Sequence, residues 1–252
     1  MYGKRPVAVV PDACTLIYAS MDENTRSGAH PVSVKNAREL LALVKSYADV
    51  CVISENLVET AAKTDAVLAM TDAEKKNFTS LVNGMKHVYF PRSEIVKQYP
   101  VIDRIYEKAR NNFEEKVDDL LATKEKLRVS KKRGVPSKRK MKRWAAAVKR
   151  KLGSTVYEKL RYKLYDEPPG EDDKYLLSFG YLLRDEYDQV FVATEDTHMC
   201  PLLPGCDMSN IIYGEIEWRL GIRTLQPFIV KKEVARILGR VGAPEGHARL
   251  NP

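Results

Sequence analysis

The sequence lacks a long hydrophobic run. No apolar stretch among its 252 residues approaches the roughly 20 residues that a membrane-spanning helix needs. Residues 1–6 lead directly into a short apolar run, without the hydrophobic region of a signal peptide. We therefore expect a cytoplasmic protein that does not associate with membranes.

Cysteine and histidine are also scarce, with 4 of each. Four cysteines are too few for a disulfide framework at this length, and the apolar surroundings of Cys14 and Cys51 predict buried thiols. His198, Cys200 and Cys206 lack a fourth ligand and match no common zinc-finger spacing. The chain also has no glycine-rich phosphate loop of the GxxxxGK[ST] type, which argues against a P-loop NTPase.

The positive charge, in contrast, is abundant and concentrated in one segment. Residues 124–151 contain 14 Lys and Arg and a single acid, Glu125, which gives a local charge of +13. Because the whole chain carries +8, the remainder has a charge of −5. Such segregation indicates a polyanionic partner, most simply a nucleic acid, although a solvated basic loop would have the same composition.

Two short apolar runs end in acidic residues. Residues 7–10 read as a buried strand that is followed by Asp12. Residues 190–194 read as a second strand, and Glu195 and Asp196 follow it directly. In open α/β sheets, ligands bind outside the carboxyl ends of the strands, so this repeated arrangement indicates a cation site.

The rest of the chain alternates between strands and amphipathic helices. Further strands are predicted near residues 50–54, 87–90 and 222–225, and helices at 33–44, 55–70, 173–183, 211–220 and 230–238. Ser33 is the expected N-cap of the first of these helices, and Thr71 and Asp72 are expected to cap another. The pattern predicts an α/β protein with a doubly wound parallel sheet flanked by helices.

The basic segment lies within a predicted helical insertion. Apolar residues recur with a helical period from Ile102 to Leu121, and residues 134–137 break the chain. A second amphipathic helix follows, with Trp144 on its apolar side as a core residue. We therefore expect an α/β domain of residues 1–101 and 167–240, an inserted helical hairpin of residues 102–166, and a tail of residues 241–252.

The acids at strand ends and helix starts would meet at one edge of such a sheet. They are Asp12, Glu55 or Glu59, Asp172 and Asp173, and Glu195 and Asp196. Each alone could be a helix cap or favour a helix N-terminus. Together, like charges at one edge repel unless a cation neutralises them, and oxygen ligands favour Mg²⁺ or Mn²⁺.

These residues resemble the acidic motifs of the PIN-domain nucleases. The resemblance covers residues 9–19, 52–60 and 170–198 and the closing helix and strand through Leu225. It implies a PIN-like fold, metal-dependent RNA cleavage, and a set of site residues in this chain: Asp12 in its DxxxLI context, Glu59 after Ser54 with Glu55 in reserve, Asp173 beside Asp172, Asp196 beside Glu195, and the accompanying hydroxyl of Thr194.

A basic helical insertion before the third acid is similar to the layout of HARP, a group of protein-only RNase P enzymes. This similarity implies structured RNA such as tRNA or rRNA as a partner. The residues expected to bind the RNA backbone are Lys131, Lys132, Arg133, Lys138, Arg139, Lys140, Lys142, Arg143, Lys149 and Arg150.

Other readings stay open at this point. A non-catalytic PIN-like module could bind RNA or act as a scaffold in a ribonucleoprotein, with acids that serve only the fold. A flap-type DNA nuclease would use the same acidic site. The basic helices would also suit a homo-oligomer interface or an acidic protein partner.

Overall fold

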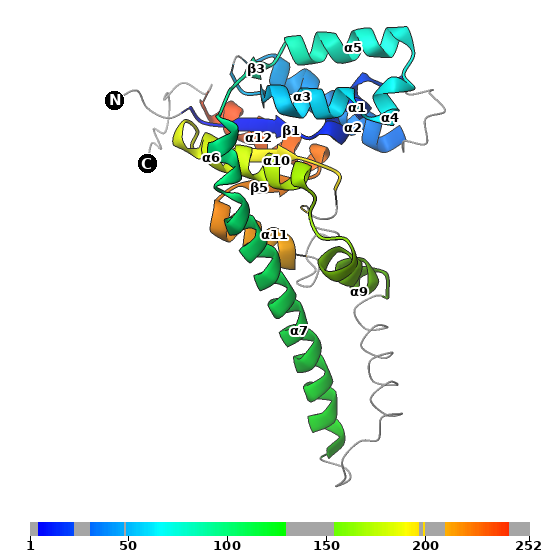
Figure 1. Cartoon of the computed structure of the whole chain (residues 1–252), viewed down its shortest axis with the longest axis vertical. Helices are drawn as coiled ribbons and strands as arrows, with labels where there is room; N and C mark the ends of the chain where they lie inside the picture. Colours follow the sequence, from blue (N-terminus) through cyan, green and yellow to red (C-terminus); the bar gives the residue numbers. More distant parts are fainter. Residues whose placement is uncertain are drawn as a thin grey trace, which may run out of the picture.

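The computed structural model describes residues 5–22, 31–47, 49–129, 154–196, 199 and 210–241. These residues form a parallel sheet between layers of helices, with one long helix that extends away from the body (Figure 1). The prediction of an α/β fold with parallel strands is therefore confirmed.

The strands form two small parallel sheets that are joined edge to edge. One sheet has the order β1-β4-β5, and the other contains β2 and β3. A parallel bridge between Val9 and Cys51 connects β1 to β2, so neighbouring strands run β3-β2-β1-β4-β5. The strands are β1 (Ala8–Pro11), β2 (Val52–Ile53), β3 (Lys86–His87), β4 (Val190–Ala193) and β5 (Arg223–Leu225). The order changes direction between β1 and β4, which is the place where open α/β sheets bind ligands.

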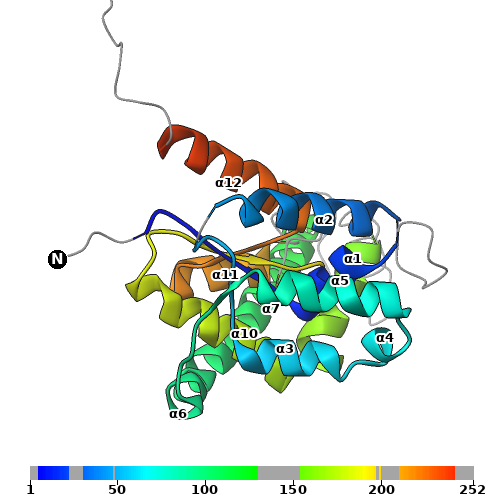
Figure 2. The same cartoon turned by 90° about the horizontal axis from the view of Figure 1, so that it is seen from above.

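Helices cover both faces of this sheet. Seen from above, α2 and α12 lie on one side of the strands, and α3 and α10 lie on the other (Figure 2). The described helices are α1 (Ala13–Ser20), α2 (Pro31–Lys45), α3 (Glu55–Ala62), α4 (Asp65–Leu68), α5 (Asp72–Asn83), α6 (Arg92–Val96), α7 (Tyr99–Val129), α9 (Ser154–Arg161), α10 (Glu171–Leu182), α11 (Ile211–Leu220) and α12 (Pro227–Val241). Among the described helices, none is both long enough and apolar enough to cross a bilayer.

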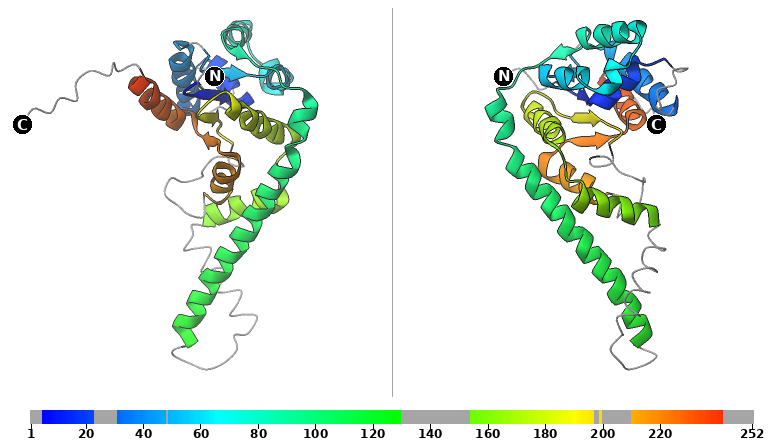
Figure 3. Two further views of the ribbon diagram at one scale, coloured as in Figure 1. Left: turned by 90° about the vertical axis from the view of Figure 1, so that its left-hand side faces the viewer. Right: turned by 45° about the vertical axis from the view of Figure 1, so that its right-hand side comes forward.

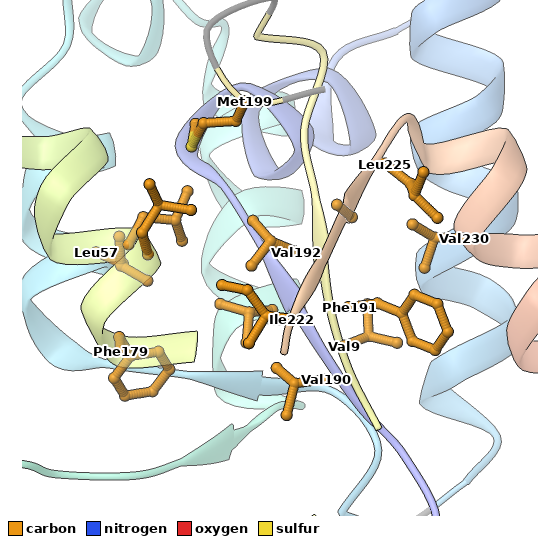
Figure 4. Close-up of a cluster of buried hydrophobic side chains, with 14 of the residues drawn as sticks. Val9, Leu57, Phe179, Val190, Phe191, Val192, Met199, Ile222, Leu225 and Val230 are labelled. Carbon is orange, nitrogen blue, oxygen red and sulfur yellow. The ribbon is translucent and has the colours of Figure 1, made fainter. Parts of the chain in front are cut away.

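The core lies on both sides of β4, because successive side chains of a strand point to opposite faces. Val190 and Val192 point toward the side of α10, whereas Phe191 points toward Val230 of α12 (Figure 4). Gly180 brings α10 close to the sheet, since an added Cβ would lie 3.3 Å from a methyl group of Val192. The apolar character of the strand on both faces therefore reflects two helical layers rather than one.

Two local predictions were wrong and one is confirmed. The single helix predicted at 55–70 is broken into α3 and α4, because the Thr64 side chain accepts a hydrogen bond from a backbone N–H of α4 and caps it. Ser33 is not an N-cap, since α2 already begins at Pro31. Thr71 caps α5 as predicted, in a reciprocal capping box with Glu74.

The predicted helix at 102–121 is present and is longer than expected. It forms the first two-thirds of α7, which starts on the body and extends away from it (Figure 3). The buried residues of α7 belong to the same core as the sheet: Ile102, Ile105, Tyr106, Ala109 and Phe113. Leu160 of α9 and Leu164 of the π-helical turn Tyr162–Asp166 pack in this core as well. Both ends of the predicted insertion are therefore anchored in the α/β body.

Candidate functional site

Asp12 lies at the carboxyl end of β1, where the sequence places the first acid. Its backbone N–H donates to the Ala193 carbonyl of β4 over 3.0 Å, so the residue sits at the junction of the two strands. Its carboxylate oxygen Oδ1 accepts a hydrogen bond of 2.6 Å from the Thr15 N–H and caps α1. The side chain is buried. The N-cap role considered from the sequence is thus real, and it fixes the carboxylate at the strand junction.

Thr194 connects Asp12 to Asp196. Its hydroxyl donates to Asp12 Oδ2 over 2.5 Å and accepts a hydrogen bond of 2.9 Å from the Asp196 N–H. The Thr194 N–H donates to the Leu225 carbonyl of β5, which holds the hydroxyl in register with the sheet. Three predicted residues from two separate segments therefore meet in one hydrogen-bonded group, to which Asp196 contributes its backbone N–H.

Burial raises the pKa of Asp12 to about 6. Hydrogen bonds from Thr194 and Thr15 lower the pKa, but they offset only part of the cost of removing the carboxylate from water. The negative charge of Asp196 raises the pKa further. A bound cation would remove this cost, because an opposite charge favours the ionised carboxylate.

Cys14 shows which other acids face this edge. Its side chain is solvent-accessible, so the prediction of a buried thiol is wrong for Cys14, whereas Cys51 is buried as predicted. The pKa of Cys14 is nevertheless raised to about 12, first by partial burial and then by surrounding negative charge. The charges that raise it all belong to carboxylates: Asp12, Asp196, Asp173 and Glu195. The edge between β1 and β4 therefore gathers acids from three separate segments of the chain.

Tyr106 of α7, the long helix, lies near the same acids. It is buried, and its pKa is raised well above the ordinary value by burial and then by the charges of Asp173 and Asp196. Tyr106 is a site residue that the sequence did not reveal. Its place on the apolar stripe of the helix predicted burial, but no local signal indicated an acidic neighbourhood.

The structure separates Asp173 from Asp172. The negative charge of Asp173 raises the pKa values of Cys14 and Tyr106. Its Oδ2 also accepts a hydrogen bond of 3.1 Å from the Gly170 N–H at the start of α10. Asp172 is exposed and acts on Tyr99 instead. The helix geometry therefore supports Asp173 as the acid that faces the site.

Glu195 and Asp196 are separated in a similar way. The negative charge of Asp196 raises the pKa values of Asp12 and Tyr106, and its backbone N–H donates to the Thr194 hydroxyl. Glu195 acts on Cys14 and on Tyr18 of α1. This arrangement favours Asp196 as the partner of Asp12.

Glu55 and Glu59 are not brought into this group. Both are exposed on α3, which is capped by Ser54, and Glu59 forms an ion pair of 3.5 Å with Lys63. Neither is among the charges that act on Asp12 or Cys14. Their role as metal ligands stays a prediction.

The donor set has the chemistry that magnesium or manganese prefers, but it is not a closed ligand cage. Among the described residues, no three His, Cys, Asp or Glu side chains lie together in a geometry that could hold a metal ion. Asp12, Asp173 and Asp196, whose charges all raise the pKa of Cys14, are hard oxygen donors. They fit a divalent cation by charge and ligand type.

The predicted RNA-binding residues lie outside the described residues. They are Lys131, Lys132, Arg133, Lys138, Arg139, Lys140, Lys142, Arg143, Lys149 and Arg150. His198, Cys200 and Cys206, which were considered as a zinc site, also lie outside them. These predictions remain at the level of the sequence.

Comparisons with known proteins give no relative. No family model matches the chain, and no curated protein or solved structure matches it either. The function has to be argued from the site itself.

Proposed function

We propose that this protein is a metal-dependent endoribonuclease with a PIN-like α/β domain. The observation that carries the proposal is Asp12, a buried carboxylate at the switch point between β1 and β4 that shares the Thr194 hydroxyl with Asp196. Burying an acid among other acids raises its pKa and costs stability, which is typical of functional sites rather than of helix caps. The strand order β3-β2-β1-β4-β5 supports the doubly wound fold that the resemblance implies.

Asp12, Asp173 and Asp196 are the residues that would hold Mg²⁺ or Mn²⁺. Such an ion supplies Lewis acidity toward a phosphodiester and lowers the pKa of a bound water. The protein's own contribution is positioning. Thr194 orients the Asp12 and Asp196 segments, Thr15 fixes the Asp12 carboxylate, and the strand junction holds all of them on rigid backbone.

The basic segment supports RNA as the substrate. The 14 Lys and Arg of residues 124–151 would bind phosphates independently of sequence, while the acidic edge itself repels them. Binding and cleavage are thus assigned to different parts of the chain, so that removal of an acid should spare binding.

The decisive experiment compares wild type with Asp12→Asn on single-stranded and structured RNAs in Mn²⁺, Mg²⁺ or EDTA. We expect wild-type cleavage that requires metal, loss of cleavage by at least about 100-fold in the variant, and unchanged RNA affinity. Asp65→Asn, an exposed acid at the start of α4, is the matched control. Absence of metal-dependent cleavage by the wild type would overturn the proposal.

One observation favours a second candidate, a non-catalytic RNA-binding or scaffold module. Both carboxylate oxygens of Asp12 accept hydrogen bonds within the fold, one from Thr15 and one from Thr194. An acid used only in this way would serve the fold. RNA binding by the wild type without cleavage in any metal would support this candidate.

A further inference from the structure

A cleft lies between α7 and the segment that leads into α10. Its volume is about 370 Å³. Its walls are formed by Asp103, Tyr106, Glu107 and Arg110 of α7, by Pro168 and Pro169, and by Lys174 of α10. Tyr106 also faces Asp173 and Asp196 at the acidic edge. Tyr106 therefore lies near both the cleft and the candidate metal site.

Two exposed tyrosines lie in the π-helical turn that Arg110 of the cleft wall contacts. Tyr162 and Tyr165 lie in the π-helical turn Tyr162–Asp166 and are 49% and 42% exposed. Exposure of two large rings in one five-residue turn is unusual for a purely structural element, and π-helical turns are frequently found at functional sites. The turn thus presents exposed aromatic rings close to a residue of the cleft wall.

The Tyr165 ring is held in a fixed orientation despite its exposure. Its hydroxyl donates to Glu114 Oε1 over 2.5 Å, and its ring centroid lies 6.4 Å from that of Phe113. The Arg110 guanidinium lies 5.9 Å from the ring centroid. A ring anchored at its edge and along one side, with area left open, can accept a base without reorganisation.

Two cationic side chains line the cleft. Arg110 contributes to the cleft wall, and its Nε donates a hydrogen bond of 2.6 Å to the Leu164 carbonyl of the π-helical turn. Lys174 reaches the cleft from α10 and pairs with Asp103 over 2.5 Å. Asp103 and Glu107 also line the cleft, so its two cations are balanced by two acids.

We infer that this cleft, with Tyr162 and Tyr165, is a subsite for unpaired nucleotides of the RNA that flank the scissile bond. Bases would stack on the tyrosines, and Arg110 and Lys174 would approach the connecting phosphates. Stacking requires a base that is free of a duplex, so the subsite selects single-stranded segments. This inference rests on the proposed function for the identity of the ligand.

The test measures RNA binding without cleavage. Fluorescence anisotropy in EDTA compares a labelled single-stranded 12-mer with a 12-base-pair duplex of the same strand. We expect Tyr162→Ala and Tyr165→Ala each to weaken single-strand binding about 10-fold and to leave duplex binding within twofold. Tyr165→Phe keeps the ring but loses its hydrogen bond to Glu114, so its single-strand affinity should fall between those of the wild type and Tyr165→Ala.

Tyr47→Ala is the matched control, because Tyr47 is also 42% exposed but precedes β2 at the opposite end of the sheet. Equal losses for single strand and duplex, or a loss in Tyr47→Ala of the same size, would overturn the subsite. So would unchanged single-strand binding in both tyrosine variants. Thermal melting of each variant establishes that it is folded.

The same proteins separate this inference from the proposed function. Tyrosine-dependent single-strand binding by a wild type that cleaves nothing in Mn²⁺ would support the subsite and overturn the nuclease. Metal-dependent cleavage with unaltered binding in the tyrosine variants would do the reverse.

Discussion

The two ends of the parallel sheet differ in the charges that surround their partly buried side chains. At the carboxyl end, Asp12 is buried, and the charges that act on the neighbouring Cys14 are all carboxylates. At the amino end, charges of both signs surround Tyr187, just before β4. The charges that act on Cys14 at the carboxyl end are therefore of one sign, whereas those that act on Tyr187 at the amino end are of both signs.

At the amino end, several polar side chains surround the phenol of Tyr187. We call this group the clasp, and it consists of Arg5, Asp49, Lys86, Glu186 and Tyr187. The Tyr187 hydroxyl donates to the Asp49 carbonyl over 3.0 Å and accepts hydrogen bonds from Lys86 Nζ and Arg5 Nη1 over 3.1 and 3.2 Å. Both cations also lie over its ring, and Arg5 pairs with Asp49 and Glu186 over 3.4 and 3.6 Å. These contacts connect the starts of several strands, which is a structural role.

The contrast indicates which end of the sheet is the better candidate for function. Charges in the clasp are paired with opposite charges and support the fold. At the carboxyl end, burial and the charge of Asp196 disfavour the ionised form of Asp12, which lowers the stability of the fold. Titratable groups perturbed in this way are typical of functional sites. Four predictions test this contrast, beginning with the largest expected effect.

Removal of acids at the two ends should affect cleavage very differently. We expect Asp173→Asn and Asp196→Asn to reduce metal-dependent RNA cleavage by about 100-fold or more, because each replaces a proposed carboxylate ligand with a neutral amide. Glu186→Gln, in the clasp, should leave cleavage unchanged. Initial rates on one labelled RNA in Mn²⁺ provide the comparison. Equal losses at both ends would contradict the assignment of the site.

The pH dependence of stability should come largely from Asp12. Its pKa is about 6 in the folded protein and 3.8 ordinarily, so the folded state holds this proton more tightly. The associated stabilisation is fully present below pH 3.8 and is lost as the pH rises through 6, a change on the order of 3 kcal/mol. The free energy of unfolding of Asp12→Asn, relative to that of the wild type, should therefore increase as the pH rises from 4 to 7.

Urea unfolding in EDTA at a series of pH values measures this gain. Asp65→Asn, an exposed acid, should give a curve parallel to that of the wild type. A destabilised Asp12→Asn at pH 7 would show that the carboxylate serves mainly as a cap.

Tyr187→Phe should lower the free energy of unfolding by about 1–2 kcal/mol. The substitution removes the donor to the Asp49 carbonyl and the acceptor for Lys86 and Arg5, while the ring stays in place. Urea denaturation gives the change. Cleavage should be unaltered, and a coupled loss of cleavage would mean that the clasp reaches the site.

Glu59→Gln should change the free energy of unfolding by less than about 0.5 kcal/mol. Its pair with Lys63 is exposed, and exposed pairs contribute little. If Glu59 is the ligand that the resemblance implies, cleavage falls in this variant while Glu55→Gln keeps it. The opposite result would assign the ligand to Glu55.

The sequence predicted the sheet and its acidic edge because buried parallel strands are nearly all apolar. Residues 7–10 and 190–194 could be recognised without any tertiary information, and Asp12 and Asp196 follow from their ends. The choice between Asp172 and Asp173 could not be made, since neighbouring residues on a helix point about 100° apart. Only the seating of α10 against α7 decides which one faces Cys14 and Tyr106.

The remaining misses have related causes. The apolar pattern continues across Thr64, so periodicity alone joined α3 and α4. Tyr106 appeared to be an ordinary core residue, because its acidic neighbours arrive more than sixty residues later in the chain. Local patterns predict burial well, but they do not predict which distant residues share a buried place.

The length of α7 has a geometric consequence. The helix runs without a break from Tyr106, at the acidic edge, to Lys124, where the basic run of the sequence begins. At 1.5 Å per residue, this rod fixes a separation of roughly 27 Å between the two. The helix therefore sets this separation, and only a polyanion long enough to span it can contact the acidic edge and the basic segment at once.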